Sequence, residues 1–160
     1  MKNFRTSLDA NDLKEDGLDG WPFGIRDMVR FSEIDALNHV NNAVYFSWLE
    51  MTRIAYLIDY GLTEMGHSTT EPQIVVRRQV ADYLAPVLFG DTYVVTLKTS
   101  RIKPSSLVME YGVFVDGQLR VSAETVVVSL TQDGTARQVW RDAAIRSIVE
   151  RDGAKLVGFD

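Results

Sequence analysis

The spacing of apolar residues changes along the chain and predicts one long helix followed by strands. Between residues 42 and 60 apolar side chains recur at helical spacing around most of the circumference. They leave one narrow polar stripe, formed by Ser47, Glu50 and Arg53. A helix that is apolar nearly all round is typically buried. We therefore expect a buried helix over residues 42–60, capped by Asn41 or Asn42 and followed by a glycine stop.

Beyond residue 72 the apolar positions follow a period of two, which predicts strands over residues 73–84, 93–100, 107–115 and 119–130. Asp116 and Gly117 between the last two runs predict a tight hairpin. A shorter strand is expected at residues 25–31 and a closing helix at 140–151. This order predicts an α+β fold in which a five-stranded antiparallel sheet wraps one long central helix. The open sheet edge predicts pairing between two chains.

The N-terminal segment differs in composition from the rest of the chain. Residues 1–20 contain five acidic side chains and few apolar ones. We expect a loosely held arm there, ahead of a single folded domain over residues 21–160. The segment has no apolar core of the kind found in secretory signals, and no run approaches the ~18 apolar residues of a membrane span. We expect a cytoplasmic protein without a membrane span.

Charge and cysteine content exclude several classes of function. The formal net charge is −5, from 17 basic and 22 acidic residues, which argues against nucleic acid as a partner. The chain has no cysteine, so disulfides, zinc-thiolate sites and cysteine nucleophiles are ruled out. Its two histidines lack a suitable carboxylate cluster, so no metal and no cofactor is expected. We assign no role to His67, in the loop after the predicted helix.

One polar segment ahead of the helix contains groups suited to acyl transfer. Asp35 is followed by His39, and Asn41 and Asn42 lie where the helix begins. The free N–H groups and positive dipole end of a helix N-terminus can hold a polarised carbonyl oxygen. A nearby carboxylate can attack that carbonyl or activate water. On these residues alone, helix capping is the commoner role for Asp, Asn and His in such a position.

A longer motif changes that balance. The segment resembles the 4-hydroxybenzoyl-CoA thioesterase-like family of hotdog proteins through Asp35-x-x-x-His39-Val40-Asn41-Asn42-x-x-Tyr45, preceded by Arg30-Phe31-Ser32-Glu33 and followed by Trp48-x-Glu50-x-x-Arg53. The family's order of one strand, motif loop, helix and four strands fits residues 25–130. The resemblance implies a hotdog fold and thioester hydrolysis without a cofactor. We interpret Glu50 and Arg53, three residues apart, as a structural ion pair on the helix.

The resemblance also implies roles for individual residues. Asp35 matches the catalytic aspartate, as nucleophile or general base, and Asn42 falls where the family places a carbonyl-polarising backbone N–H. Tyr45, one turn into the helix, is expected to line the acyl pocket. His39 belongs to the His-Val-Asn-Asn form of the motif, which also resembles plant acyl-ACP thioesterases. Those enzymes have an asparagine two residues after the aspartate, where this chain has Leu37.

A second segment resembles the family's stretch of basic residues followed by serines between two strands. Its members are Arg101, Lys103, Ser105 and Ser106. Cationic side chains bind the phosphates of a nucleotide such as coenzyme A well. Without the family context, a basic strand end that aids solubility is an equal alternative.

The resulting expectation is an acyl-CoA thioesterase that works as a homodimer or homotetramer. Three alternatives stay open. The first is hydrolysis of acyl-ACP, the second is a hotdog hydratase or dehydratase, and the third is a non-catalytic acyl-CoA-binding domain. Acyl-chain length and carrier do not follow from the sequence.

Overall fold

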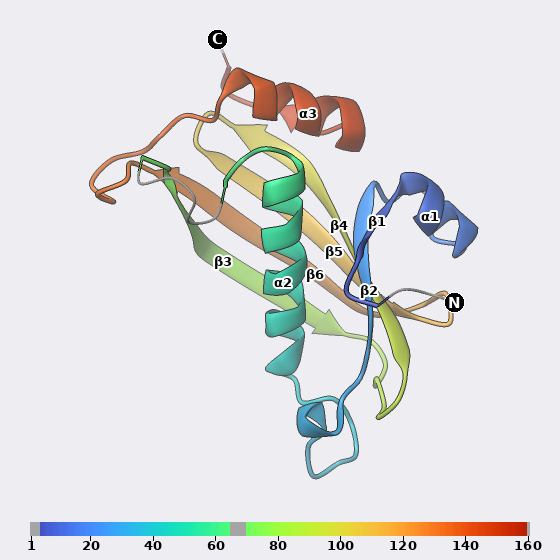
Figure 1. Cartoon of the computed structure of the whole chain (residues 1–160). Helices are drawn as coiled ribbons and strands as arrows, with labels where there is room; N and C mark the ends of the chain where they lie inside the picture. Colours follow the sequence, from blue (N-terminus) through green and yellow to red (C-terminus); the bar gives the residue numbers. More distant parts are fainter. Residues whose placement is uncertain (1–3, 65–69, 160) are drawn as a thin grey trace.

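A sheet with one long helix lying across one of its faces forms the centre of the molecule (Figure 1). The structure is a computed structural model that describes residues 4–64 and 70–159. Its elements are β1 (Ser7–Asp9), α1 (Ala10–Glu15), β2 (Phe23–Met28), the 3-10 turn η1 (Phe31–Glu33), α2 (Val44–Asp59), β3 (Gln73–Tyr83), β4 (Thr92–Lys103), β5 (Ser106–Val115), β6 (Gln118–Leu130), α3 (Asp142–Asp152) and β7 (Lys155–Leu156).

The sheet has seven strands, where the sequence predicted five. Its order is β1-β2-β4-β5-β6-β3, and β7 pairs in parallel with β4. The five antiparallel strands expected from the sequence, β2 to β6, are all present. The β5–β6 hairpin turns at Asp116 and Gly117, whose positive φ angles of 50° and 72° suit a tight hairpin turn. The additional strands β1 and β7 have three and two residues, too few to show an alternating pattern.

The described part of the N-terminal segment, residues 4–20, is folded against the sheet, where the sequence predicted a loose arm; residues 1–3 of that prediction lie outside the described residues. β1 pairs with β2, and Asp9 and Asp12 form a reciprocal capping box at the start of α1. Leu8, Leu13 and Leu18 are buried against Val94 on the outer face of the sheet. Three leucines spaced five residues apart fit neither the strand nor the helix period, so the pattern alone missed them.

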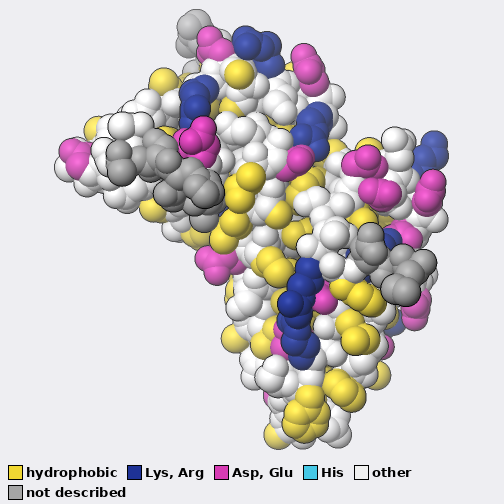
Figure 2. Space-filling model, in the orientation of Figure 1, with side chains coloured by type: hydrophobic (Ala, Val, Ile, Leu, Met, Phe, Trp, Pro, Cys, Tyr) yellow, Lys and Arg dark blue, Asp and Glu magenta, His cyan; other side chains and the backbone are white. Residues whose placement is uncertain are grey.

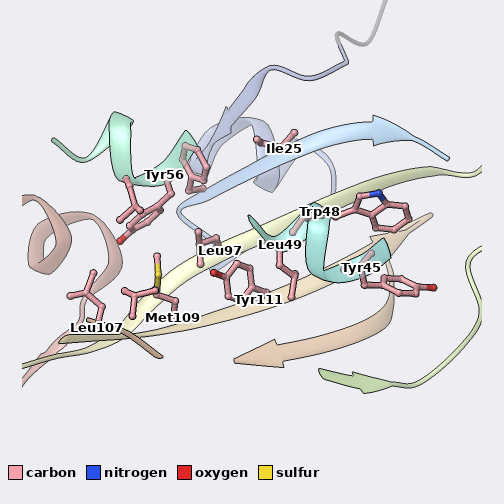
Figure 3. Packing of buried hydrophobic residues seen from close by; sticks show 14 of the residues in the cluster. Ile25, Tyr45, Trp48, Leu49, Tyr56, Leu97, Leu107, Met109 and Tyr111 are labelled. Atoms are coloured by element: carbon pink, nitrogen blue, oxygen red, sulfur yellow. The ribbon is translucent and has the colours of Figure 1, made fainter. Parts of the chain in front are cut away.

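Helix α2 is shorter than predicted and packs on the inner face of the sheet. It covers Val44–Asp59, and its N-cap is Ala43 in place of the expected Asn41 or Asn42. The Trp48 ring stacks on Tyr93 of β4 with a centroid distance of 3.8 Å. Figure 3 shows further side chains of this core, which include Tyr45, Leu49 and Tyr56 of α2 and Leu97, Leu107, Met109 and Tyr111 of β4 and β5.

One side of the molecule leaves apolar surface uncovered. β3 forms one end of the sheet, and Val75, Val76, Val80 and Tyr83 on it are each more than one third exposed. The outer side of α2 is only partly covered, and Ile58 is exposed. Figure 2 shows apolar side chains running down the middle of the face where α2 lies. No helix in the described part of the chain is long and apolar enough to cross a membrane.

Candidate active site

The segment between β2 and α2 forms a compact loop. A backbone bridge joins Ile34 and Val40, and inside it the Asp35 N–H donates to the His39 carbonyl at 2.9 Å. The Asn38 N–H donates to the Asp35 carbonyl at 3.0 Å. Asn38 has a φ of 59°, a conformation that Asn tolerates better than most residues. The loop therefore places Asp35 directly beside His39.

Hydrogen bonds to the β3–β4 connection and to α2, and one within the loop itself, hold this motif loop in place. The Val40 N–H donates to the Val87 carbonyl of the β3–β4 connection at 2.9 Å. The Asn41 N–H donates to the Glu33 carbonyl at 2.9 Å, and the indole of Trp48 in α2 donates to the Glu33 carboxylate at 2.9 Å. The motif's Glu33 and Trp48 thus join the loop to the helix.

The predicted catalytic residues meet at one cavity of about 430 Å³. The motif loop and the first turn of α2 form one wall, and the end of β3 with the residues that follow it forms the other. The lining residues are Asp35, Leu37, His39, Val40, Asn42 and Tyr45 on the first side and Tyr83, Leu84, Ala85 and Pro86 on the second.

Asp35 is half-buried, and its carboxylate is not used to cap α2. One carboxylate oxygen, Oδ1, accepts the Leu37 N–H at 2.8 Å within the loop. No other described residue donates a hydrogen bond to this carboxylate, so Oδ2 remains available to a substrate or a water. The side-chain contact at the helix start is made by Asn41, whose Oδ1 accepts the Ala43 N–H at 2.9 Å. Neither Asp35 nor Asn41 therefore caps α2 with its side chain.

The backbone at the start of α2 offers a free donor. The Val44 N–H donates a hydrogen bond to the Asn41 carbonyl at 2.9 Å. In the described part of the chain, the Asn42 N–H donates to no acceptor. The Asn42 carbonyl accepts the Tyr83 hydroxyl at 2.8 Å. An unpaired N–H beside the positive end of a helix dipole is suited to an oxygen that gains negative charge.

Tyr45 provides a neutral aromatic wall with a hydroxyl. Its side chain is buried, and its ring contacts Trp48 and Tyr83 at centroid distances of 5.0 Å and 5.4 Å. Burial raises the pKa of Tyr45 to about 12, while a hydrogen bond with the backbone of Val87 and, less strongly, the positive charge of Arg120 oppose that shift. The hydroxyl therefore stays protonated at neutral pH and can donate a hydrogen bond.

Sequence reasoning missed the β3 side of the cavity. Tyr83 ends a strand in a part of the sequence with no motif, and nothing in its spacing marks it as part of a site. Only the order of the elements could have pointed to Tyr83. β3 follows α2 in the chain and runs back along it, so the end of β3 lies near the start of α2. Arg120 was missed as well. It is the extra residue of a β-bulge in β6, opposite Val113 and Phe114, and bulges commonly redirect a side chain near functional sites.

The basic segment lies far from Asp35 in the same chain. Arg101 and Lys103 are exposed near the end of β4, and Ser105 and Ser106 are half-buried in the following turn and at the start of β5. The other end of β4 lies near the motif loop, and the strand's 12 residues separate its ends by about 40 Å. One chain therefore does not bring these four residues together with Asp35, His39 and Asn42.

Residues 4–64 and 70–159 contain no group of three or more His, Asp or Glu side chains placed to hold a metal ion. His67, to which we assign no role, lies outside the described residues.

Comparison with known proteins agrees with the fold and the motif. The thioesterase-like superfamily matches residues 29–148, three quarters of the chain. The chain therefore belongs to this superfamily, and the resemblance in its sequence is confirmed.

Similar proteins come from several bacteria. A thioesterase superfamily protein from Jannaschia sp. CCS1 is 31% identical with a TM-score of 0.92, and the match covers 98% of this chain and 100% of that one. A Thermus thermophilus thioesterase, solved with coenzyme A and zinc, is 34% identical with a TM-score of 0.71, covering 86% and 98%. A Synechococcus 1,4-dihydroxy-2-naphthoyl-CoA hydrolase is 33% identical over 100 residues, 59% of this chain and 67% of the hydrolase.

Proposed function

We propose that the protein is an acyl-CoA thioesterase that hydrolyses an acyl thioester to a free acid and coenzyme A. The observation that carries this proposal is the cavity in which Asp35, His39 and the unengaged Asn42 N–H meet. Membership of the thioesterase-like superfamily supports the reaction class. Coenzyme A in the Thermus thermophilus thioesterase and the name of the Synechococcus hydrolase support the carrier.

The proposed chemistry needs only groups of this chain and water. The thioester carbonyl oxygen accepts the Asn42 N–H at the positive end of α2, which stabilises the charge that develops on it. Asp35 acts as nucleophile or as general base. As general base, Asp35 takes a proton from a water whose oxygen bonds to the carbonyl carbon. As nucleophile, Asp35 bonds to that carbon itself, and water then hydrolyses the resulting anhydride and restores the carboxylate. The C–S bond breaks, and the coenzyme A sulfur leaves with a proton. In this proposal His39, which lines the same cavity, hydrogen-bonds at the reacting centre.

We further propose that the active form is a dimer built on β3, or a tetramer of such dimers. An unpaired edge strand with exposed valines is a template for a second copy, and an antiparallel pair of β3 strands would extend the sheet across both subunits. The partly covered side of α2 lies next to that edge, so the same contact would bury it.

A dimer of this kind would also bring the two predicted segments together. A two-fold axis through β3 turns the partner end for end, so the partner's β4–β5 turn lies level with this subunit's motif loop. Within each subunit β5 and β6 lie between β4 and the edge strand β3. The β4–β5 turn of the partner therefore lies about 14 Å from the partner's β3, measured across the sheet. We propose that Arg101, Lys103, Ser105 and Ser106 of one subunit bind the coenzyme A whose thioester lies at Asp35 of the other.

The experiment is a thiol-release assay with a panel of acyl-CoA substrates on wild-type protein and the Asp35→Asn variant. An amide can neither attack the carbonyl nor take a proton, so we expect kcat to fall about 100-fold or more with the fold intact. The matched control is Asp19→Asn, which removes an exposed carboxylate outside the cavity and away from β3. It should keep wild-type turnover.

Three results would contradict the proposal. A folded Asp35→Asn variant with near-normal turnover would make Asp35 a loop residue only. Hydration of enoyl-CoA without thiol release would indicate a hydratase. Binding of acyl-CoA without turnover would indicate a non-catalytic domain. Running the panel with acyl-ACP as well distinguishes the two carriers.

A further inference from the structure

A second cavity lies along the same face of α2, further from the motif loop. Its volume is about 620 Å³, and α2 and the first half of β3 form its main walls. β3 runs from this cavity, at Ile74–Val76, to the first one, at Tyr83, so both cavities lie between the same helix and the same strand. The lining residues that argue for a role are Arg53, Glu50 and Glu71.

Arg53 is a buried cation with weak partners. Only 6% of its side chain is exposed. It donates to the Tyr111 hydroxyl at 3.4 Å, a long hydrogen bond, and lies 3.9 Å from the Glu50 carboxylate, which is 64% exposed. Glu71, the second acid at the cavity, is instead paired with Arg141 at 3.0 Å. The ion pair expected from the sequence between Glu50 and Arg53 therefore exists only as a loose contact.

Burial of the Arg53 guanidinium costs solvation free energy that its present contacts do not restore. A guanidinium removed from water regains its lost solvation only from a close, well-oriented anion, at about 2.7–2.9 Å. Neither contact of Arg53 meets that condition. The cavity walls beside it are otherwise largely aliphatic, with Ile54 and Leu57 on the helix and Val75 and Val76 on the strand. An anionic oxygen at the end of an apolar chain would match both the walls and the charge.

Two further polar groups lie between the cavities. Gln79 of β3 and Thr125 of β6 are cross-strand neighbours. The Gln79 Nε2 is buried and has no hydrogen-bond partner in the described part of the chain, whereas the Thr125 hydroxyl lies within reach of the Tyr111 hydroxyl. Buried polar atoms without a partner are uncommon in folded proteins. The Gln79 amide can donate to an oxygen atom of a ligand that extends along β3 from the first cavity toward Arg53.

We infer that Arg53 forms a specificity subsite for acyl groups whose distal end carries a carboxylate. This inference rests on the proposed thioesterase function and names its substrate class. Arg53 lies nine residues after Val44, about 14 Å along the helix, and its side chain leans back toward the helix N-terminus. A medium-length acyl chain held at Asn42 would therefore reach the guanidinium.

The test compares substrates that differ only at the distal end. We would measure kcat/KM for adipoyl-, suberoyl- and sebacoyl-CoA beside hexanoyl-, octanoyl- and decanoyl-CoA. At the length that fits, wild-type protein should prefer the carboxylate. In Arg53→Met that preference should fall roughly tenfold to hundredfold, mainly through KM, with the alkyl substrates little changed. Glu50→Gln, which removes the competing carboxylate, should keep or strengthen the preference.

Binding separates this inference from the reaction itself. Calorimetry of suberoyl-CoA and octanoyl-CoA with the Asp35→Asn variant, with and without Arg53→Met, gives the same comparison without turnover. Absence of hydrolysis for every substrate would contradict the proposed function, while the binding preference would still test the subsite. No carboxylate preference at any length in wild-type protein would overturn the subsite. Equal losses of kcat/KM on both substrate series in Arg53→Met would also overturn it. Arg53 would then have a structural role only, in joining α2 to Tyr111.

Discussion

The Tyr83 hydroxyl donates a 2.8 Å hydrogen bond to the Asn42 carbonyl, so the last residue of β3 fixes the backbone just before α2. This contact crosses the candidate active site and positions the residue whose N–H is proposed to bind the substrate carbonyl. Tyr83 is therefore a positioning residue in the proposed reaction.

Removing the hydroxyl tests that role. In Tyr83→Phe we expect kcat to fall by roughly twofold to tenfold with KM little changed, because a single lost hydrogen bond of about 0.5–1.5 kcal/mol would act on the transition state. The phenylalanine ring keeps the packing on Tyr45. Thermal unfolding should show only a small loss. An unchanged kcat would mean that the contact stabilises the loop without influencing the reaction.

The second prediction concerns the carrier. Changing both Arg101 and Lys103 to Ala should weaken the use of acyl-CoA, because each removes a charge-assisted contact to phosphate. The loss should shrink with added salt, since both side chains are exposed. An N-acetylcysteamine thioester lacks the nucleotide and should be almost insensitive. Equal losses on both substrates would assign the two residues to the fold.

The third prediction concerns assembly. Sedimentation at micromolar concentration should show a dimer or larger species, because β3 leaves its edge and its valines uncovered. Val80→Lys should shift the equilibrium toward monomer by placing a charge at that edge. Phe4→Lys is the control, since Phe4 is 45% exposed and precedes β1, at the opposite end of the sheet from β3. A monomeric wild-type protein would remove the proposed interface and the shared site.

The fourth prediction concerns the dependence of stability on pH. Asp152 accepts the Tyr56 and Tyr60 hydroxyls, each at 2.6 Å, and burial raises its pKa above the ordinary value of 3.8. The folded state therefore holds this proton more tightly than the unfolded state. The contribution of Asp152 to stability should accordingly fall as pH rises from 3.8 through the raised pKa.

Urea unfolding at a series of pH values, compared between wild type and Asp152→Asn, measures that contribution. Asp133→Asn is the control, and its pH dependence should run in the opposite direction. Hydrogen bonds from Thr131 and Thr135 lower the pKa of Asp133 to about 2. Its contribution should be present above pH 3.8 and be lost as pH falls toward 2. The same pH trend for both variants would contradict the assignment for Asp152.

The parts of this fold that follow a regular period could be predicted from sequence. The strands of the central sheet repeat every two residues and α2 follows the helical period, so both were found, with boundaries shifted by a few residues. The packing of Leu13 and its neighbours was missed because their spacing fits no period. Their burial depends on the sheet's outer face, which exists only once β2 and β4 have paired.

The candidate site was predictable where a motif marks it and not elsewhere. Asp35, His39 and Asn42 lie in one short segment, and the structure brings them to one cavity. Tyr83 reaches that cavity through the chain's return along α2, which local spacing does not encode. The sequence also shows that Glu50 and Arg53 can meet, but not that one is buried while the other faces solvent. Burial is a property of the surrounding tertiary structure.

The Val40–Val87 hydrogen bond joins segments 47 residues apart, and it has a consequence for amide hydrogen exchange. The Val40 amide can exchange only when the motif loop separates from the β3–β4 connection, so its exchange rate reports the opening of the site and not the unfolding of the sheet. An acyl ligand that bridges the two cavity walls must oppose this opening. The single amide of Val40 should therefore show slower exchange on ligand binding, even where the slowest-exchanging amides of the sheet are unchanged.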